Sequence, residues 1–152
     1  MKDNREYQIK LMSALAKVFP GQEPEEDPCC TGFTMLRGET FSFVAAYTCG
    51  GGNGGRGNFD AVVRVESPAA EYCRIREIIP VPSLRPVNSC ADSNYLRTQP
   101  GMYPDLLTEP AGGRITFTPG QFKSLWIDVE IPENGPHGEI PVAVVFASPE
   151  GE

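Results

Sequence analysis

Few side chains in this sequence have the type and spacing that catalysis requires. Nucleophilic catalysis by serine or cysteine needs a neighbouring base, usually a histidine. The single histidine, His137, lies in a Pro-His-Gly turn that we expect to face water. Carboxylate pairs are another catalytic device, but Asp128 and Glu130 alternate along one stretch and would lie on the solvent face of a strand. The sequence therefore predicts no catalytic residue in this chain.

A glycine-rich segment, residues 49–58, invites comparison with phosphate-binding loops. A P-loop requires Gly-Lys-Ser/Thr after its glycines, and a dinucleotide-binding fingerprint requires a following helix. Here the glycines continue as Arg56, Gly57 and Asn58, and the next segment, FDAVVRVE, alternates like a strand. The glycines therefore favour a hairpin loop, and we predict no cofactor.

The cysteines also argue against a metal site. There are five of them, an odd number that fits a reducing compartment better than a disulfide framework. The sequence has no Cys-x-x-Cys pair and only one histidine, so no metal site is predicted. The adjacent Cys29 and Cys30 could form a strained disulfide, although two loop thiols are the simpler interpretation.

Trp126 is the most informative candidate for binding. It alternates with Leu125 and Ile127, so the indole points outward if these two side chains face the core. A large aromatic side chain on the outer face of a sheet is often covered by another domain or by a ligand. Three alternatives are open: the domain's own loops, a neighbouring domain or a sugar ring covers Trp126.

A second candidate surface lies in the proline-rich stretch 80–110. Proline fixes the backbone and long loops are often functional, so a rigid loop with aromatic side chains makes a good docking edge. The alternative is a loop that folds over the end of the domain. The interface or sugar-contact candidates from both surfaces are Trp126, Tyr95, Met102, Tyr103 and Asp105.

Most of the chain has the two-residue period of strands. Only residues 11–19, LMSALAKVF, have a helical period, which predicts a short helical turn near 13–19 that ends at Pro20-Gly21. Apolar alternation predicts strands at about 40–47, 59–66, 72–79, 114–118, 123–131 and 139–147. The stretch 80–110 is predicted to be a long ordered loop or an edge segment. The prediction is one all-β domain over 1–152, an immunoglobulin- or fibronectin-like antiparallel β-sandwich with one short N-terminal helix.

Composition excludes two classes of partner. The net charge is −7 and the arginines are scattered, whereas a nucleic-acid binder needs a basic stripe. An anionic membrane surface is disfavoured for the same reason. The charged N-terminal stretch lacks the apolar segment of a signal peptide, and no run has the length of a membrane helix. We therefore expect a cytoplasmic location.

Several segments together resemble the N-terminal β-sandwich of glycoside hydrolase family 123-like proteins, many of which are catalogued only as a domain of unknown function. The segments are LAKVFPGQEP (15–24), LRGETFSF (36–43), PGMYPDLL (100–107), SLWIDVEIP (124–132) and the turn GEIP (138–141). They are spread over almost the whole chain. The sequence departs from the family at Ile140, where the turn usually has tyrosine, and in its longer glycine-rich loop.

The resemblance implies an accessory role. In such proteins the sandwich precedes a (β/α)-barrel that carries a catalytic Asp-Glu pair, and related enzymes hydrolyse N-acetylhexosaminides with help from the substrate's acetamido group. This chain would then be a non-catalytic domain that packs against a C-terminal catalytic barrel through Trp126 and the 95–107 loop. The alternatives are a carbohydrate-binding module that uses Trp126, Tyr103 and Tyr95, and a small enzyme.

Overall fold

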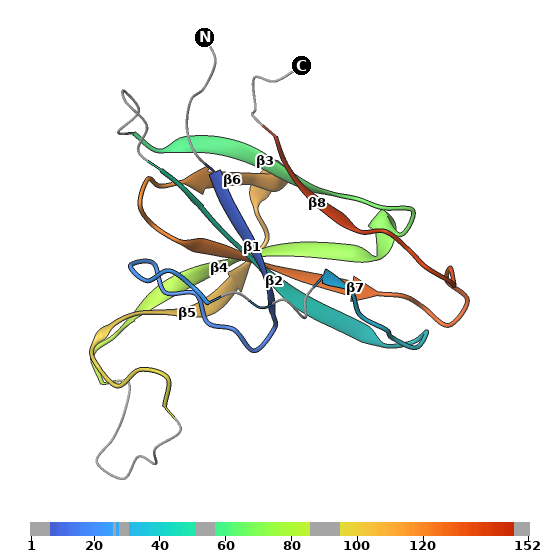
Figure 1. Cartoon of the computed structure of the whole chain (residues 1–152), viewed down its shortest axis with the longest axis horizontal. Helices are drawn as coiled ribbons and strands as arrows, with labels where there is room; N and C mark the ends of the chain where they lie inside the picture. The colour runs from blue at the N-terminus through green and yellow to red at the C-terminus, as the bar shows by residue number, and fades with distance from the viewer. Residues whose placement is uncertain (1–6, 26, 28–30, 51–56, 86–94, 148–152) are drawn as a thin grey trace.

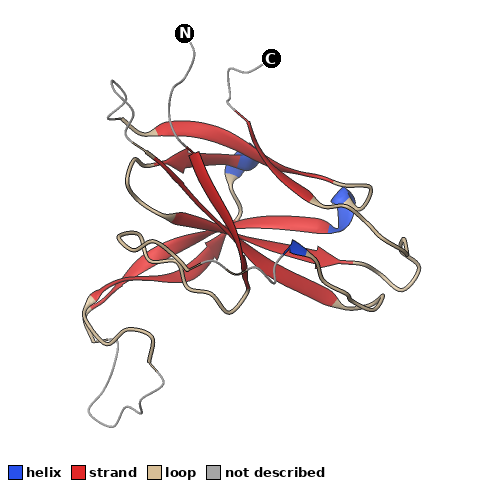
Figure 2. Ribbon diagram, viewed as in Figure 1, coloured by secondary structure: helices blue, strands red, loops and turns tan. Residues whose placement is uncertain are grey.

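Strands make up nearly all of the regular structure (Figure 2). The computed structural model describes residues 7–25, 27, 31–50, 57–85 and 95–147. The strands are β1 (Tyr7–Ser13), β2 (Thr40–Cys49), β3 (Phe59–Glu66), β4 (Cys73–Ser83), β5 (Gly101–Thr108), β6 (Arg114–Phe117), β7 (Lys123–Glu130) and β8 (Ala143–Ala147). Two short 3₁₀ turns, η2 (Ala70–Tyr72) and η3 (Ala111–Gly113), precede β4 and β6. No helix among the described residues is long and apolar enough to cross a membrane.

The strands form two antiparallel sheets of unequal width (Figure 1). Sheet A has five strands in the order β1-β2-β7-β4-β5, and sheet B has three in the order β6-β3-β8. Inward side chains from both sheets pack together in one apolar core, which confirms the predicted all-β sandwich. The finer assignment to an immunoglobulin- or fibronectin-like type stays a prediction.

The core follows from the two-residue alternation of the strands. In sheet A, Phe43 of β2 lies opposite Ile127 of β7, and Ala45 lies opposite Leu125. These side chains and Tyr47 are buried against residues from β3 and β6. The sheet B residues of this core are Ala61, Val63, Ile115 and Phe117. The prediction that the aliphatic residues of 123–131 face inward is therefore confirmed.

The predicted helical turn near 13–19 is reduced to a single turn at its start. Residues before it form strand β1, and only one turn follows, closed by a 3.0 Å hydrogen bond from Ala16 N to Ser13 O. All seven residues of β1 lie opposite residues of β2, so the backbone groups on that side of β1 find partners in the sheet. Met12 is buried in the process. This tertiary pairing outweighs the local helical period of the sequence.

A loop over the whole of 80–110 is wrong, whereas the alternative of an edge segment is confirmed for part of this stretch. Strand β4 continues to Ser83, and β5 pairs with it from Gly101 to Thr108. The prolines are tolerated because β5 is an edge strand and the ladder shifts register between Ile79 and Pro80. At the C-terminal end, the last strand begins at Ala143 rather than at 139. Most of the glycine-rich loop, Cys29 and Cys30 lie outside the described residues.

We predict that Leu125→Ala destabilises the fold by about 2–5 kcal/mol, because a fully buried leucine would leave a cavity between the sheets. Leu15→Ala is the matched control, since Leu15 is 87% exposed and its truncation should change stability by less than about 0.5 kcal/mol. Urea denaturation of both variants measures the difference. Equal effects of the two substitutions would contradict the described core.

Candidate functional site

Trp126 lies on the outer face of sheet A, opposite the core. It pairs across the ladder with Val44 of β2 and with Arg76 of β4. Its indole is partly buried against a second apolar cluster that contains Val44, Met12 and Val18. Of the three alternatives for what covers Trp126, the structure has the first, since the domain's own chain packs against the indole.

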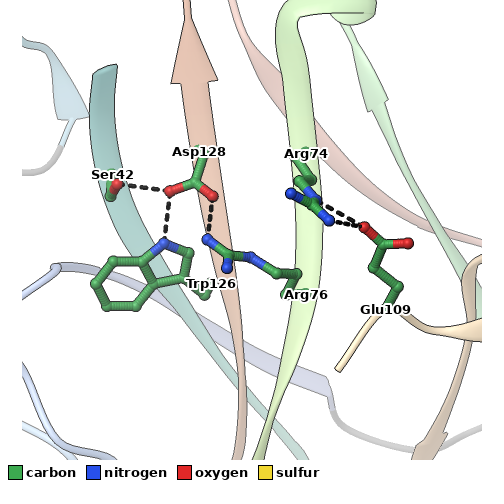
Figure 3. Close-up of polar contacts among 6 residues, drawn as sticks. All are labelled: Ser42, Arg74, Arg76, Glu109, Trp126 and Asp128. Atoms are coloured by element: carbon green, nitrogen blue, oxygen red, sulfur yellow. Dashed lines mark hydrogen bonds and ion pairs between the residues drawn. The ribbon is translucent and has the colours of Figure 1, made fainter. Parts of the chain in front are cut away.

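A polar network surrounds the indole on the same face (Figure 3). Trp126 Nε1–H donates a 2.6 Å hydrogen bond to Asp128 Oδ1, and the Ser42 hydroxyl donates a 2.6 Å bond to the same oxygen. Arg76 forms an ion pair with the other carboxylate oxygen of Asp128. One aspartate thus fixes the indole, a serine on β2 and an arginine on β4.

The network keeps Asp128 ionised. Partial burial by itself raises the pKa of this carboxyl, but the hydrogen bonds from Ser42, Trp126 and Arg76, with the charge of Arg76, outweigh it and hold the pKa below its usual value. A carboxylate with a lowered pKa is a weak base at neutral pH. The Ser42–Asp128 pair is therefore suited to holding strands together and not to activating a nucleophile.

Residues 14–24, which we call the cover segment, follow β1 (Figure 1, blue) and place Ala16 and Val18 in the apolar cluster against which Trp126 packs. Pro20 O accepts a 3.0 Å hydrogen bond from Phe122 N, just before β7. Farther along, Lys10 of β1 donates a 2.8 Å bond to Glu23 Oε1 and a 3.0 Å bond to Pro24 O. Val18 is buried beside Trp126 as a result.

A pocket of about 430 Å³ opens where the cover segment meets β5, and we call it the β5 pocket. Lys17 and Phe19 come from the cover segment, and the remaining lining comes from β4, β5 and the residues before β5. The other lining residues are Val81, Ser83, Tyr95, Leu96, Arg97, Tyr103, Pro104 and Asp105. The ring of Phe19 meets that of Tyr103 edge to face at 5.7 Å, which joins the two walls.

Three of the five predicted contact residues, Tyr95, Tyr103 and Asp105, line this one pocket. Met102 is on β5 and 42% exposed, but it does not line the pocket. Trp126 lies apart from it, in the cluster under the cover segment. Their roles as contact residues stay predictions.

Two residues that complete the β5 pocket, Arg97 and Phe19, were not among the contact residues predicted from the sequence. Arg97 Cζ lies 5.1 Å from the centre of the Phe19 ring and 5.7 Å from that of Tyr103. The closeness of Arg97 to Tyr95 in the sequence was a usable signal. The approach of Phe19 was not, because it depends on the tertiary path of the cover segment.

The described residues offer little catalytic chemistry. No three metal-binding side chains gather among them. Burial raises the pKa of the Cys73 thiol, which disfavours the nucleophilic thiolate. His137 is exposed in its turn, as predicted.

A second hollow lies beside Arg74, Arg76 and Asp128, and its arginines already form ion pairs, Arg76 with Asp128 and Arg74 with Glu109 (Figure 3). The site most suited to a ligand is thus the β5 pocket.

Comparison with known proteins gives a structural match only. No family model and no curated protein matches the sequence. Among solved structures, the chain is similar to a family 123 glycoside hydrolase from Clostridium perfringens studied for glycolipid glycan hydrolysis, with a TM-score of 0.64 and 12% identity. The two share a fold. The match covers 96% of this chain but only 25% of the hydrolase.

We predict that Asp128→Asn destabilises the domain by about 1–3 kcal/mol at neutral pH, because Arg76 loses its charged partner. Glu109→Gln is the control, since the pair between Arg74 and Glu109 is exposed and should contribute about 0–1 kcal/mol. Urea unfolding followed by Trp126 fluorescence measures both.

The effect of Asp128→Asn should depend on pH. The folded pKa of Asp128 is lowered, so its contribution is complete above the unfolded value of about 3.9 and is lost as pH falls through the lower, folded pKa. The stability difference between wild type and Asp128→Asn should therefore persist down to about pH 4 and shrink below it. A difference that grows toward acid pH would contradict the network.

Proposed function

We propose that this chain is a non-catalytic accessory domain of a glycoside hydrolase and that it packs against the catalytic barrel of that enzyme. The observation that supports this proposal is the fold match, in which nearly the whole chain corresponds to a quarter of a family 123 hydrolase. A sandwich of this fold thus occurs as one part of a longer enzyme. The parent enzyme would hydrolyse N-acetylhexosaminides in the cytoplasm.

An apolar ledge on β1 is the best-suited docking surface for the barrel. Tyr7, Ile9 and Leu11 lie opposite Cys49, Tyr47 and Ala45, so they point to the core side of sheet A. Sheet B covers this edge only in part, since the Tyr7 ring meets Phe59 and Phe117 edge to face at 5.6 and 5.8 Å. The three side chains, which we call the β1 ledge, are 45%, 46% and 38% exposed.

The β1 ledge suits a domain contact better than Trp126 does. The indole of Trp126 is already covered by its own chain, and its N–H group is bonded to Asp128. The ledge, in contrast, is a row of apolar side chains that water contacts, and a neighbouring domain would remove it from water at a gain of roughly 25 cal/mol per Å². An edge strand is moreover a common place for protein contact.

A carbohydrate-binding module is the second candidate, and the β5 pocket favours it. Sugar-binding sites combine exposed aromatic faces with a few polar groups. Tyr95 is 44% exposed in this pocket, and Ser83 and Asp105 provide polar atoms beside it. The two candidate functions use different surfaces, so one protein could have both.

The accessory role predicts no turnover by this chain alone and a measurable affinity for the catalytic barrel of its hydrolase. A chromogenic N-acetylhexosaminide should not be hydrolysed above the buffer rate, because the described residues include no activated acid-base pair. Calorimetric titration with the separately produced barrel should show binding. The double variant Ile9→Ser/Leu11→Ser should weaken it at least about tenfold, because it removes apolar area from the contact.

Leu36→Ser is the matched control, since Leu36 is 70% exposed and lies outside the β1 ledge. It should leave the affinity for the barrel unchanged. Hydrolysis by the isolated chain, or equal affinities for the double variant and wild type, would contradict the proposed role.

A further inference from the structure

We propose that the β5 pocket binds a sugar that carries a carboxylate, and that Arg97 is the residue that binds this carboxylate. The inference rests on the carbohydrate-binding candidate above and adds the charge class of the ligand. It is independent of the packing of β1 against a barrel. Three observations support it: the fixed position of Arg97, its lack of a carboxylate partner among the described residues and the mixed lining of the pocket.

Arg97 is held in place before any ligand arrives. Its guanidinium lies against the rings of Phe19 and Tyr103. The Tyr103 hydroxyl donates a 2.6 Å hydrogen bond to Gln99 O and a 3.3 Å bond to Arg97 O, which fixes the backbone of this stretch. Gly101 leaves room for the side chain, since a Cβ there would stand 2.9 Å from Arg97 Nη2. A preorganised guanidinium loses little freedom when it binds an anion.

The positive charge of Arg97 is not neutralised within the described part of the chain. Ion pairs join other cations to carboxylates there, as in Lys10–Glu23, Arg64–Glu66, Arg74–Glu109 and Arg76–Asp128. Neither Arg97 nor Lys17 forms an ion pair with any described carboxylate. Two unpaired cations at one pocket are notable in a chain whose net charge is −7. Asp105 is the one acidic side chain in the described lining of the pocket, so that described lining has a net positive charge.

The rest of the lining suits a sugar ring. Tyr95 offers a half-exposed ring for stacking against the apolar face of a pyranose. Asp105 and Ser83 can accept hydrogen bonds from hydroxyl groups, which a simple apolar anion lacks. Arg97 can then form a charge-assisted, bidentate pair with a carboxylate on that ring. A volume of about 430 Å³ is ample for one or two sugar rings.

The test compares two ligands that differ only in the carboxylate, methyl β-glucuronide and methyl β-glucoside. Calorimetry and NMR titration of this chain should show tighter binding of the glucuronide, by about tenfold or more. Arg97→Gln should abolish that preference and leave the weak affinity for the glucoside. Gly101→Ala should reduce the preference as well, because its Cβ displaces the flexible end of Arg97 while the fold persists.

Arg114→Gln is the control for net charge, since Arg114 is exposed at the start of β6 in sheet B, away from the pocket. It should change neither affinity. Acetate is the control for a bare anion and should bind far more weakly than the glucuronide.

Each outcome decides the inference. Equal binding of both glycosides would overturn it while leaving a neutral sugar site. Acetate binding as tight as the glucuronide would also overturn it, because the pocket would then hold any small anion. Binding of neither glycoside would overturn the inference together with the carbohydrate-binding candidate, and the accessory role would still be judged by affinity for the barrel.

Discussion

The burial of β7 on both faces is the constraint on which the rest of the structure depends. One face of this strand places Leu125 and Ile127 in the core between the sheets. The other face places Trp126 and Asp128 on the outside of sheet A, where an uncovered indole would be unfavourable. The cover segment packs against the indole of Trp126, and Asp128 accepts a hydrogen bond from its N–H group. A strand in the middle of a five-stranded sheet thus needs partners on two sides.

The two edge strands of sheet A, β1 and β5, carry surfaces with different properties. At the β1 edge, sheet B covers the apolar side chains only in part, and they form the β1 ledge. At the β5 edge, part of the cover segment and the residues before β5 enclose a pocket whose described lining has a net positive charge. The first edge is suited to contact with another domain and the second to a small polar ligand. The β1 ledge follows from the smaller width of sheet B, and the β5 pocket follows from the path of the cover segment.

The sequence could predict those parts of the fold that depend on local alternation. Strand β7 was predicted because its aliphatic residues occur at every second position, and this pattern has one structural solution. Strand β1 was missed because Leu11, Leu15 and Val18 also fit a helical period, and only pairing with β2 decides between the two. The prolines of β4 and β5 obscured a ladder that the sheet edge tolerates.

The candidate site was predictable only in part, for a related reason. Tyr95, Tyr103 and Asp105 are close in sequence, so their clustering could be expected. The approach of Phe19 and Lys17 joins segments that are far apart in the chain, and no local pattern encodes it. The cover over Trp126 has the same origin, since Val18 reaches the indole only after the chain has turned back from β1. The parts of the site that depend on long-range packing therefore could not be predicted from local sequence patterns.

Hydrogen–deuterium exchange of this chain, with and without the catalytic barrel of the proposed parent hydrolase, tests the proposed accessory role most directly. Strand β1 is at the edge of sheet A, so the amides on its outer side exchange freely unless another domain covers them. The account predicts that the barrel slows exchange across Tyr7–Ser13 and leaves β5 unchanged. Unchanged exchange in β1 at a saturating concentration of the barrel would contradict it.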